Sequence, residues 1–178
     1  KEIADNEYKN NLDLLEMPKE IKNASFKDIY TNDKKREPII KYFEEQAEKT
    51  PDSIAMVYEN TKMTYKELNE KANSLAYYLR NNNIGRNDIV GIMVNRSLEM
   101  IVSILAVLKS GACYIPIDPE YPQDRIEYML SNSNAKMLLT FEKLQDKVNF
   151  ENKLFVELNN NLYNSHKKNL ENIKSVVK

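Results

Sequence analysis

Apolar residues through the middle of the chain recur at two different spacings, and these predict helices alternating with strands. Spacings of three and four residues are typical of amphipathic helices and cover segments 38–49, 65–81 and 122–131. Short runs rich in β-branched and aromatic residues lie between them and predict strands at 54–58, 89–94, 113–117 and 135–140. A weaker run predicts one further strand at 154–156.

Two consecutive segments indicate how these elements pack. The strand at 89–94 is a near-continuous apolar run, which is typical of a strand buried on both faces of a parallel sheet. The segment 98–109 is apolar on most sides, so it predicts a buried helix, with Ser97 as its N-cap. Strands and helices that alternate at these lengths predict right-handed βαβ crossovers. The predicted fold class is therefore α/β, a mostly parallel sheet with flanking helices.

Several residues mark where the predicted elements begin and end. Pro38 suits the first position of a helix, and Thr64 with Glu67 forms a capping box at the start of the helix 65–81. Gly85 is expected to take the left-handed conformation that ends this helix, and Gly111 ends the buried helix. A turn at 59–60 predicts a short return strand through Lys62 and Met63.

The two ends of the chain are less ordered in pattern than its middle. Residues 1–37 are rich in Lys, Asn, Glu and Asp and predict a linker with one short helix at 8–17. Order weakens after Phe141, and residues 159–178 show only a faint helical pattern. The chain is therefore predicted to divide into a linker, 1–37, and one domain, 38–178.

Composition removes several kinds of site. The 178 residues include only three glycines, and Gly85, Gly91 and Gly111 fit neither the dinucleotide fingerprint nor the P-loop. One histidine and one cysteine exclude a His/Cys zinc site of three or four ligands, a disulfide framework and a Cys-x-x-Cys redox pair. The chain predicts no metal site of this kind.

Charge and hydropathy bear on partners and location. The 26 basic and 27 acidic residues give a net charge of −1, so no excess field favours nucleic acid as a partner. The longest apolar stretch, 100–108, is far shorter than the roughly 20 residues that cross a bilayer. The first residues contain no apolar signal core, and a lone thiol suits a reducing compartment, so we expect a soluble cytoplasmic protein without a membrane partner.

The titratable residues give no catalytic constellation. Cys113 lies inside an apolar strand, and packing is its expected role rather than nucleophilic attack. Asp118 with Glu120 resembles a pair of acids, but Asp118 followed by proline more readily makes the turn that leaves the strand. The neighbouring Glu44 and Glu45 are expected to form a solvated helix face.

Four other residues receive structural interpretations. Tyr114 and Pro116 indicate an edge strand or a strand end, because proline cannot donate to a central ladder. Arg125 has the position of an anion ligand at a helix start, but a surface ion pair with Asp124 or Glu120 is preferred. His166 is expected to be exposed. No residue of this chain is assigned as catalytic, cofactor-binding or metal-binding.

Three stretches, taken in order, resemble the start of the adenylation domain of nonribosomal peptide synthetases. They are FEEQAEKTPD at 43–52, MTYKEL at 63–68 and LKSGACYIPIDP at 108–119, the last continuing through Tyr-Pro at 121–122 and Arg-Ile at 125–126. The segment RSLEM at 96–100 is also similar to the sequence that the family has at this position. Ser110, Ala112 and Cys113 replace the more usual Ala, Gly and Ala, and all are small enough to preserve close packing. The resemblance covers about residues 38–140.

The resemblance implies an adenylate-forming enzyme. Such an enzyme activates an amino acid with ATP and Mg²⁺, releases pyrophosphate, and transfers the acyl group to the phosphopantetheine thiol of a carrier domain. It implies that residues 1–37 resemble the linker that follows a condensation domain. It also implies that the phosphate-binding loop and the specificity pocket lie outside this chain, so the isolated chain is expected to be a silent fragment.

Three alternatives remain open on the sequence alone. The chain is compatible with part of an acyl-CoA or aryl-acid ligase of the same superfamily, with a non-catalytic interaction or scaffold domain, and with a flavodoxin-like nucleotide binder.

A sheet that normally continues beyond this chain would also expose an apolar edge, which predicts dimerisation, strand exchange or poor solubility.

Overall fold

The computed structural model describes residues 38–171. The chain divides into two compact units, 1–37 and 38–178, and the account below concerns the second unit alone. The linker and the short helix predicted at 8–17 lie outside the described residues.

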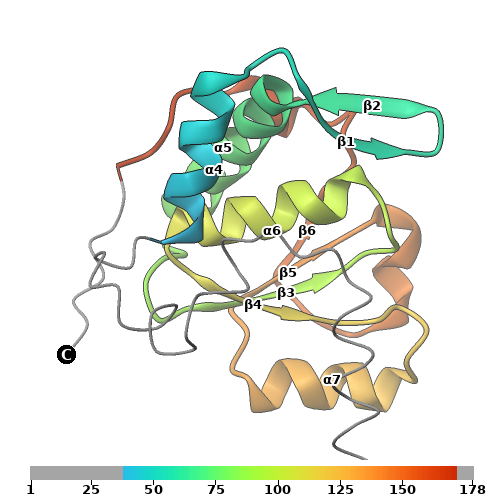
Figure 1. The fold of residues 1–178 in the computed structure, drawn as a ribbon. Helices are drawn as coiled ribbons and strands as arrows, with labels where there is room; N and C mark the ends of the chain where they lie inside the picture. Colours follow the sequence, from blue (N-terminus) through green and yellow to red (C-terminus); the bar gives the residue numbers. More distant parts are fainter. Residues whose placement is uncertain (1–37, 172–178) are drawn as a thin grey trace, which may run out of the picture. The chain divides into compact units, whose positions relative to one another are not determined.

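A four-stranded parallel sheet forms the centre of this unit (Figure 1). Its strands are β3 (Ile89–Met93), β4 (Cys113–Pro116), β5 (Met137–Thr140) and β6 (Lys153–Phe155), in the spatial order β4-β3-β5-β6. Val90 of β3 pairs with Tyr114 of β4 on one side and with Met137 of β5 on the other. The predicted parallel sheet and the weak strand near 154–156 are both confirmed.

Helices cover both faces of the sheet. On one face lies α6 (Leu98–Ser110), with α5 (Tyr65–Asn81) packed over it, and on the other lies α7 (Gln123–Asn132) (Figure 1). Gly91 of β3 allows the close approach of α7, because a Cβ atom there would lie 2.8 Å from Leu130 Cδ2 and 2.9 Å from Leu138 Cδ1. Helix α6 begins at Ser97, whose hydroxyl accepts from Met100 N, as predicted.

A helix and a hairpin precede this sheet. Helix α4 (Ile39–Lys49) packs against α5 and α6, while β1 (Ile54–Tyr58) and β2 (Thr61–Thr64) pair antiparallel through a turn at Glu59, where φ is 51°. Pro38 is the N-cap rather than the first helical residue. Ile39 is 71% exposed, because the face that packs is the one that carries Ile40 and Ala47.

The start of α5 agrees with the sequence and its end does not. Thr64 N donates to Glu67 Oε2 at 2.8 Å and Glu67 N donates to Thr64 Oγ1 at 3.2 Å, which confirms the capping box. Gly85 does not end the helix. Asn83 takes the left-handed conformation, with φ of 59°, and Ile84 N donates to Leu79 O at 2.9 Å in a Schellman arrangement.

After β5 the chain turns irregular. Short 3₁₀ helices, η1 (Glu142–Lys147) and η2 (Asn161–Asn164), flank β6, and residues 165–171 contain no helix, while the rest of the segment with the faint helical pattern, 172–178, lies outside the described residues. We call residues 163–170 the strap. Among residues 38–171, no helix combines the length and apolar character that a membrane crossing requires.

The strap is held on α5 by polar side chains. Asn73 Nδ2 donates to Lys167 O and to Asn169 Oδ1, both at 2.9 Å, and Ser74 Oγ lies 3.0 Å from His166 O. Asn73 and Ser74 are completely buried. The side of α5 that faces away from the apolar core is therefore also a packing surface, and the strap covers it.

Candidate functional site

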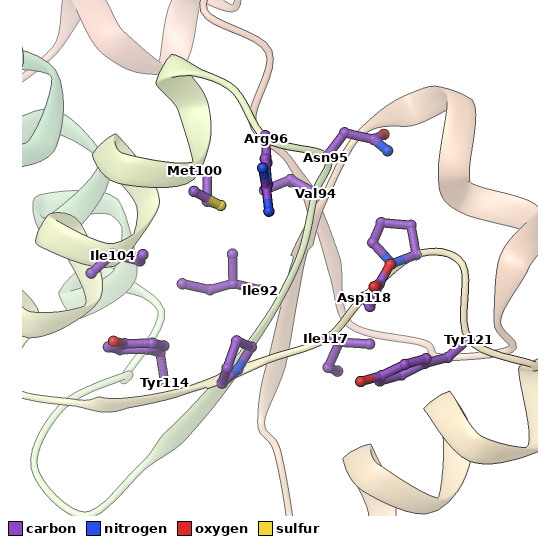
Figure 2. Close-up of a pocket in the computed structure, with 12 residues that line it drawn as sticks. Ile92, Val94, Asn95, Arg96, Met100, Ile104, Tyr114, Ile117, Asp118 and Tyr121 are labelled. Carbon is purple, nitrogen blue, oxygen red and sulfur yellow. The ribbon is translucent and has the colours of Figure 1, made fainter. Parts of the chain in front are cut away.

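A groove opens between α6 and β4, at the carboxyl ends of β3 and β4 (Figure 2). Its volume is about 420 Å³. Open α/β sheets commonly bind ligands in crevices at the carboxyl ends of their strands. Of the hollows in the described part of the chain, this one lies closest to the resembling segment at 108–119.

The walls of the groove come from three elements whose side chains converge. Ile92 and Val94 alternate along and just beyond β3, and Tyr114 and Pro116 alternate along β4, so all four reach the same face of the sheet. Met100 and Ile104, four residues apart on α6, form the opposite wall (Figure 2). The walls are mostly apolar.

Polar groups stand where the strands end. Asn95 and Arg96 belong to the connection from β3 to α6, and Asp118 follows β4. Asp118 Oδ1 accepts from Glu120 N at 2.9 Å, and Tyr121 N donates to Asp118 O at 3.1 Å. These bonds confirm the predicted turn at Asp118 and explain why Asp118 and Glu120 do not form a pair of acids.

Two sequence-based assignments, one on β4 and one on α7, are corrected. Cys113 was expected to pack in a core, but β4 is an outer strand and Cys113, its first residue, is exposed. Arg125 was expected to form a surface ion pair; instead its guanidinium lies 3.9 Å from the centroid of the Tyr121 ring. A cation–π contact needs no acidic partner, which is why charge spacing did not predict it.

His166 is also placed differently from expectation. It is half-buried, and its ring is stacked on Tyr77 of α5 with centroids 4.5 Å apart. Cys113, the single cysteine of the sequence, is on β4, whereas His166 belongs to the strap on α5. The structure therefore does not bring the single Cys and the single His together as a nucleophile and base.

A buried ion pair was missed by sequence reasoning. Lys109 Nζ of α6 donates to Glu44 Oε1 of α4, and the two side chains are 1% and 12% exposed. Arg80 Nη2 of α5 donates to Lys109 O at 2.7 Å, so three helices meet at this point. The predicted solvated face is thus wrong at Glu44. The signal available was Lys109 in the last turn of an otherwise apolar helix, which needs a partner if that helix is buried.

The charges in this cluster act on one another. Burial lowers the pKa of the Lys109 ammonium, whereas the hydrogen bond to Glu44 acts in the opposite direction. The Phe43 ring lies 5.7 Å from Lys109 Nζ. The cluster lies where α4, α5 and α6 meet, at the carboxyl end of α6, and its geometry is that of a structural joint.

The described residues do not make a site for ATP. At the N-terminus of α6, the N–H of Met100 is already bonded to Ser97 Oγ and Glu99 lies in the first turn, while α7 carries Asp124 in its first turn. Acidic groups at these positions disfavour phosphate. Within residues 38–171, no three His, Cys, Asp or Glu side chains are grouped to hold a metal ion. The groove can hold an apolar group beside one carboxylate and one guanidinium, and nothing in it performs chemistry by itself.

Comparison with known sequences identifies the family. The model for AMP-binding enzyme matches residues 43–176. Bacitracin synthase 1 of Bacillus licheniformis is 46% identical over 146 residues, which are 80% of this chain and 3% of that protein. Gramicidin S synthase 2 of Brevibacillus brevis is 56% identical over 108 residues, 61% of this chain and 2% of that protein. The chain thus spans a small part of the length of these curated relatives.

Solved structures agree with the sequence relatives. A crystal structure of the nonribosomal peptide synthetase FmoA3 matches with a TM-score of 0.71 and 25% identity, over 78% of this chain and 16% of that one. The N-terminal subdomain of NpsA from Klebsiella oxytoca matches with a TM-score of 0.65 and 28% identity, over 76% of this chain and 35% of that one. The chain therefore belongs to the AMP-binding enzyme family and corresponds to the N-terminal part of an adenylation domain of the nonribosomal peptide synthetase type.

Proposed function

We propose that this chain is the scaffold portion of a domain that activates an amino acid with ATP to an aminoacyl adenylate. The family match over residues 43–176 is the observation that carries the proposal. The wider enzyme would then transfer the aminoacyl group to the phosphopantetheine thiol of a carrier domain, with Mg²⁺ assisting the adenylation step. A carboxylate is a poor electrophile, and joining it to AMP supplies a good leaving group, which is why ATP is needed.

The proposed division of labour follows from the geometry of the described residues. They supply a covered parallel sheet and an apolar groove, but neither a phosphate cradle nor a metal-binding group. The groups that bind ATP, Mg²⁺ and the amino acid are therefore assigned to other parts of the wider enzyme. Residues 38–178 contribute the sheet on which those parts are built.

Residues 1–37 are proposed as the linker that joins this domain to a preceding condensation domain. The support is their polar composition. The proposed partners are thus the rest of the adenylation domain, the condensation domain and the carrier domain. Dimerisation through the β4 edge is a further proposal, supported by the position of β4 as an outer strand.

The direct test is ATP–pyrophosphate exchange, measured with the multidomain enzyme that contains this chain. We expect exchange that depends on one amino acid. Exchange with aryl or fatty acids alone would favour the ligase alternative, and no exchange with any carboxylic acid would favour the scaffold alternative. The 178-residue chain alone should give no exchange, and turnover by it would contradict the assignment of ATP binding to other parts.

A further inference from the structure

The groove between α6 and β4 holds two opposite charges that do not pair with each other. Arg96 precedes α6 and Asp118 follows β4, and both line the groove. Within residues 38–171, no ion pair or hydrogen bond engages the Arg96 guanidinium, and no ion pair engages the Asp118 carboxylate. Figure 2 shows Arg96 directed into the groove, whereas the neighbouring Asn95 points away from it. Both charges are therefore available to a ligand.

The backbone holds the two charged residues in fixed places. Arg96 lies between Val94, which is 6% exposed just after β3, and Ser97, which caps α6. Asp118 Oδ1 accepts from Glu120 N at 2.9 Å, which orients the carboxylate and leaves Oδ2 to accept from a ligand. A site whose charged groups are already placed loses little freedom when a ligand binds.

The two charges come from neighbouring strands. Ile92 of β3 pairs with Pro116 of β4, and Arg96 and Asp118 each follow this pair within a few positions of their strands. Adjacent strands lie about 4.8 Å apart. The site therefore suits a ligand that carries its opposite charges close together.

The remainder of the groove is apolar. Ile92, Ile104 and Tyr114 contribute to its walls, and its volume of about 420 Å³ falls within the range of about 300–1,000 Å³ that is usual for small-molecule pockets. A carboxylic acid without an amine would be repelled by Asp118, and an amine without an acid would be repelled by Arg96. A zwitterion with an apolar side chain matches both charges and the walls.

We propose that this groove binds a free α-amino acid with an apolar side chain. The carboxylate of the ligand accepts from the Arg96 guanidinium, its ammonium donates to the Asp118 carboxylate, and its side chain packs against Ile104 and Tyr114. The inference goes beyond the proposed function and does not rest on it, because the amino acid that is adenylated is assigned to other parts of the wider enzyme. The groove is a second site, at which the amino acid binds and does not react.

The test is a titration of the 178-residue chain, followed by the NMR signals of the Met100 and Ile104 methyl groups. L-leucine should shift these signals saturably, with a dissociation constant on the order of 1 mM, as suits a ligand of this size. N-acetyl-L-leucine lacks the ammonium, L-leucinamide lacks the carboxylate and glycine lacks the side chain, so each should bind about tenfold more weakly. No response to L-leucine, or a response of equal strength to any one of the three analogues, would overturn the proposal.

Two variants ask whether the named residues carry this selectivity. Arg96→Gln should bind L-leucine about tenfold more weakly and should no longer prefer it over L-leucinamide, whereas Asp118→Asn should lose the preference over N-acetyl-L-leucine. Asp118→Asn keeps an oxygen that accepts from Glu120 N, so the turn is retained. Lys147→Gln, on the exposed surface of η1, is the control and should bind as the wild type does.

An unchanged preference in either variant would contradict the roles of Arg96 and Asp118. The comparison of L-leucine with its analogues uses the wild-type chain, so it tests the site even where a variant fails to fold.

Discussion

Single residues at the joint of three helices determine how α4 is seated. Ile40 and Ala47 are its fully buried apolar residues, and Glu44 lies between them, bonded to Lys109 of α6. A buried ion pair adds little net stability, but it is costly to break because the remaining charge has no partner. The pair therefore fixes the register of α4 on α6 more than it strengthens the contact.

Glu44→Gln should lower the free energy of unfolding by about 3 kcal/mol, since Lys109 stays buried without a counter-charge. The double variant Glu44→Leu with Lys109→Met should lose much less, because both charges are removed together. Urea unfolding of the single variants Glu44→Leu and Lys109→Met and of the double variant measures the coupling. A double variant as unstable as the sum of its singles would show that the pair is not coupled.

Because of Asp88, just before β3, we expect the stability of the chain to depend on pH in the acid range. The hydrogen bond from Lys136, at 2.7 Å, and the N–H of Gly85 lower the pKa of the Asp88 carboxyl in the folded chain. Its contribution is therefore present above the unfolded value of about 4 and is lost as the pH falls through the folded value. Asp88→Asn should cost about 0.5 kcal/mol at pH 7.

The difference between wild type and Asp88→Asn should shrink below about pH 4, as measured by unfolding at a series of pH values. The substitution Asp146→Asn is the matched control, because Asp146 is exposed in the short helix η1. A difference that grows in acid would contradict the assigned sign. This contribution could not have been predicted from the sequence, since Lys136 is 48 positions away and meets Asp88 only after β3 and β5 pair.

For the helices, the sequence predicted the caps correctly where the capping contact lies within one turn. Thr64 with Glu67, Ser97 and Gly111 were predicted correctly because each acts within one turn of its helix. Gly85 was predicted wrongly because Asn83 also tolerates the left-handed conformation and comes first in the chain. Tyr114 and Pro116 correctly indicated an edge strand or a strand end, but the exposure of Cys113 was missed because the apolar run around it favoured a packing role.

The capping box of α5 predicts a modest loss of stability when its oxygen is removed. Thr64→Ala removes the oxygen that accepts from Glu67 N and should reduce stability by about 1 kcal/mol. Thr64→Ser keeps the oxygen and should lose clearly less. Thermal unfolding of both variants tests this, and equal losses would indicate that the methyl group rather than the cap is responsible.

At Gly91 we predict a larger loss of stability, caused by an added side-chain atom and not by a removed one. Gly91→Ala places a Cβ atom within 3 Å of Leu130 Cδ2 and Leu138 Cδ1, so these side chains must move. We expect a loss of about 1–3 kcal/mol, the usual range for an overpacked core. Combining Gly91→Ala with Leu130→Ala should recover part of the stability in urea unfolding, and no recovery would contradict the contact as its cause.

For the molecule as a whole, the sequence predicted the α/β class and the parallel sheet, because hydrophobic period follows directly from burial. It did not predict the strap, because Asn73, Ser74 and His166 interact across about ninety residues and carry no periodic signal. The groove between α6 and β4 was missed for a related reason. The sequence pattern assigned each of its lining residues to packing. Only the order of the strands in the sheet brings these residues together around one groove.

Loss of the polar contacts of the strap predicts its release without general unfolding. Asn73→Ala removes both hydrogen bonds to the strap, and losing about 1.4 kcal/mol corresponds to tenfold more frequent opening. Trypsin should then cut after Lys167 or Lys168 roughly tenfold faster, while cleavage elsewhere stays unchanged. Asn81→Ala, at the exposed last residue of α5, is the control. Uniformly faster cleavage would indicate global destabilisation instead.

The central claim, that this chain supplies the scaffold of an adenylation domain, is tested most directly by exchange of segments. Residues 43–140 would replace the matching segment in an adenylation domain of gramicidin S synthase 2, to which the chain is 56% identical over 108 residues. The hybrid should catalyse ATP–pyrophosphate exchange with the amino acid preference of the recipient, because the groups that bind substrates are assigned to other parts. A folded hybrid without exchange, or one with a changed preference, would contradict the account.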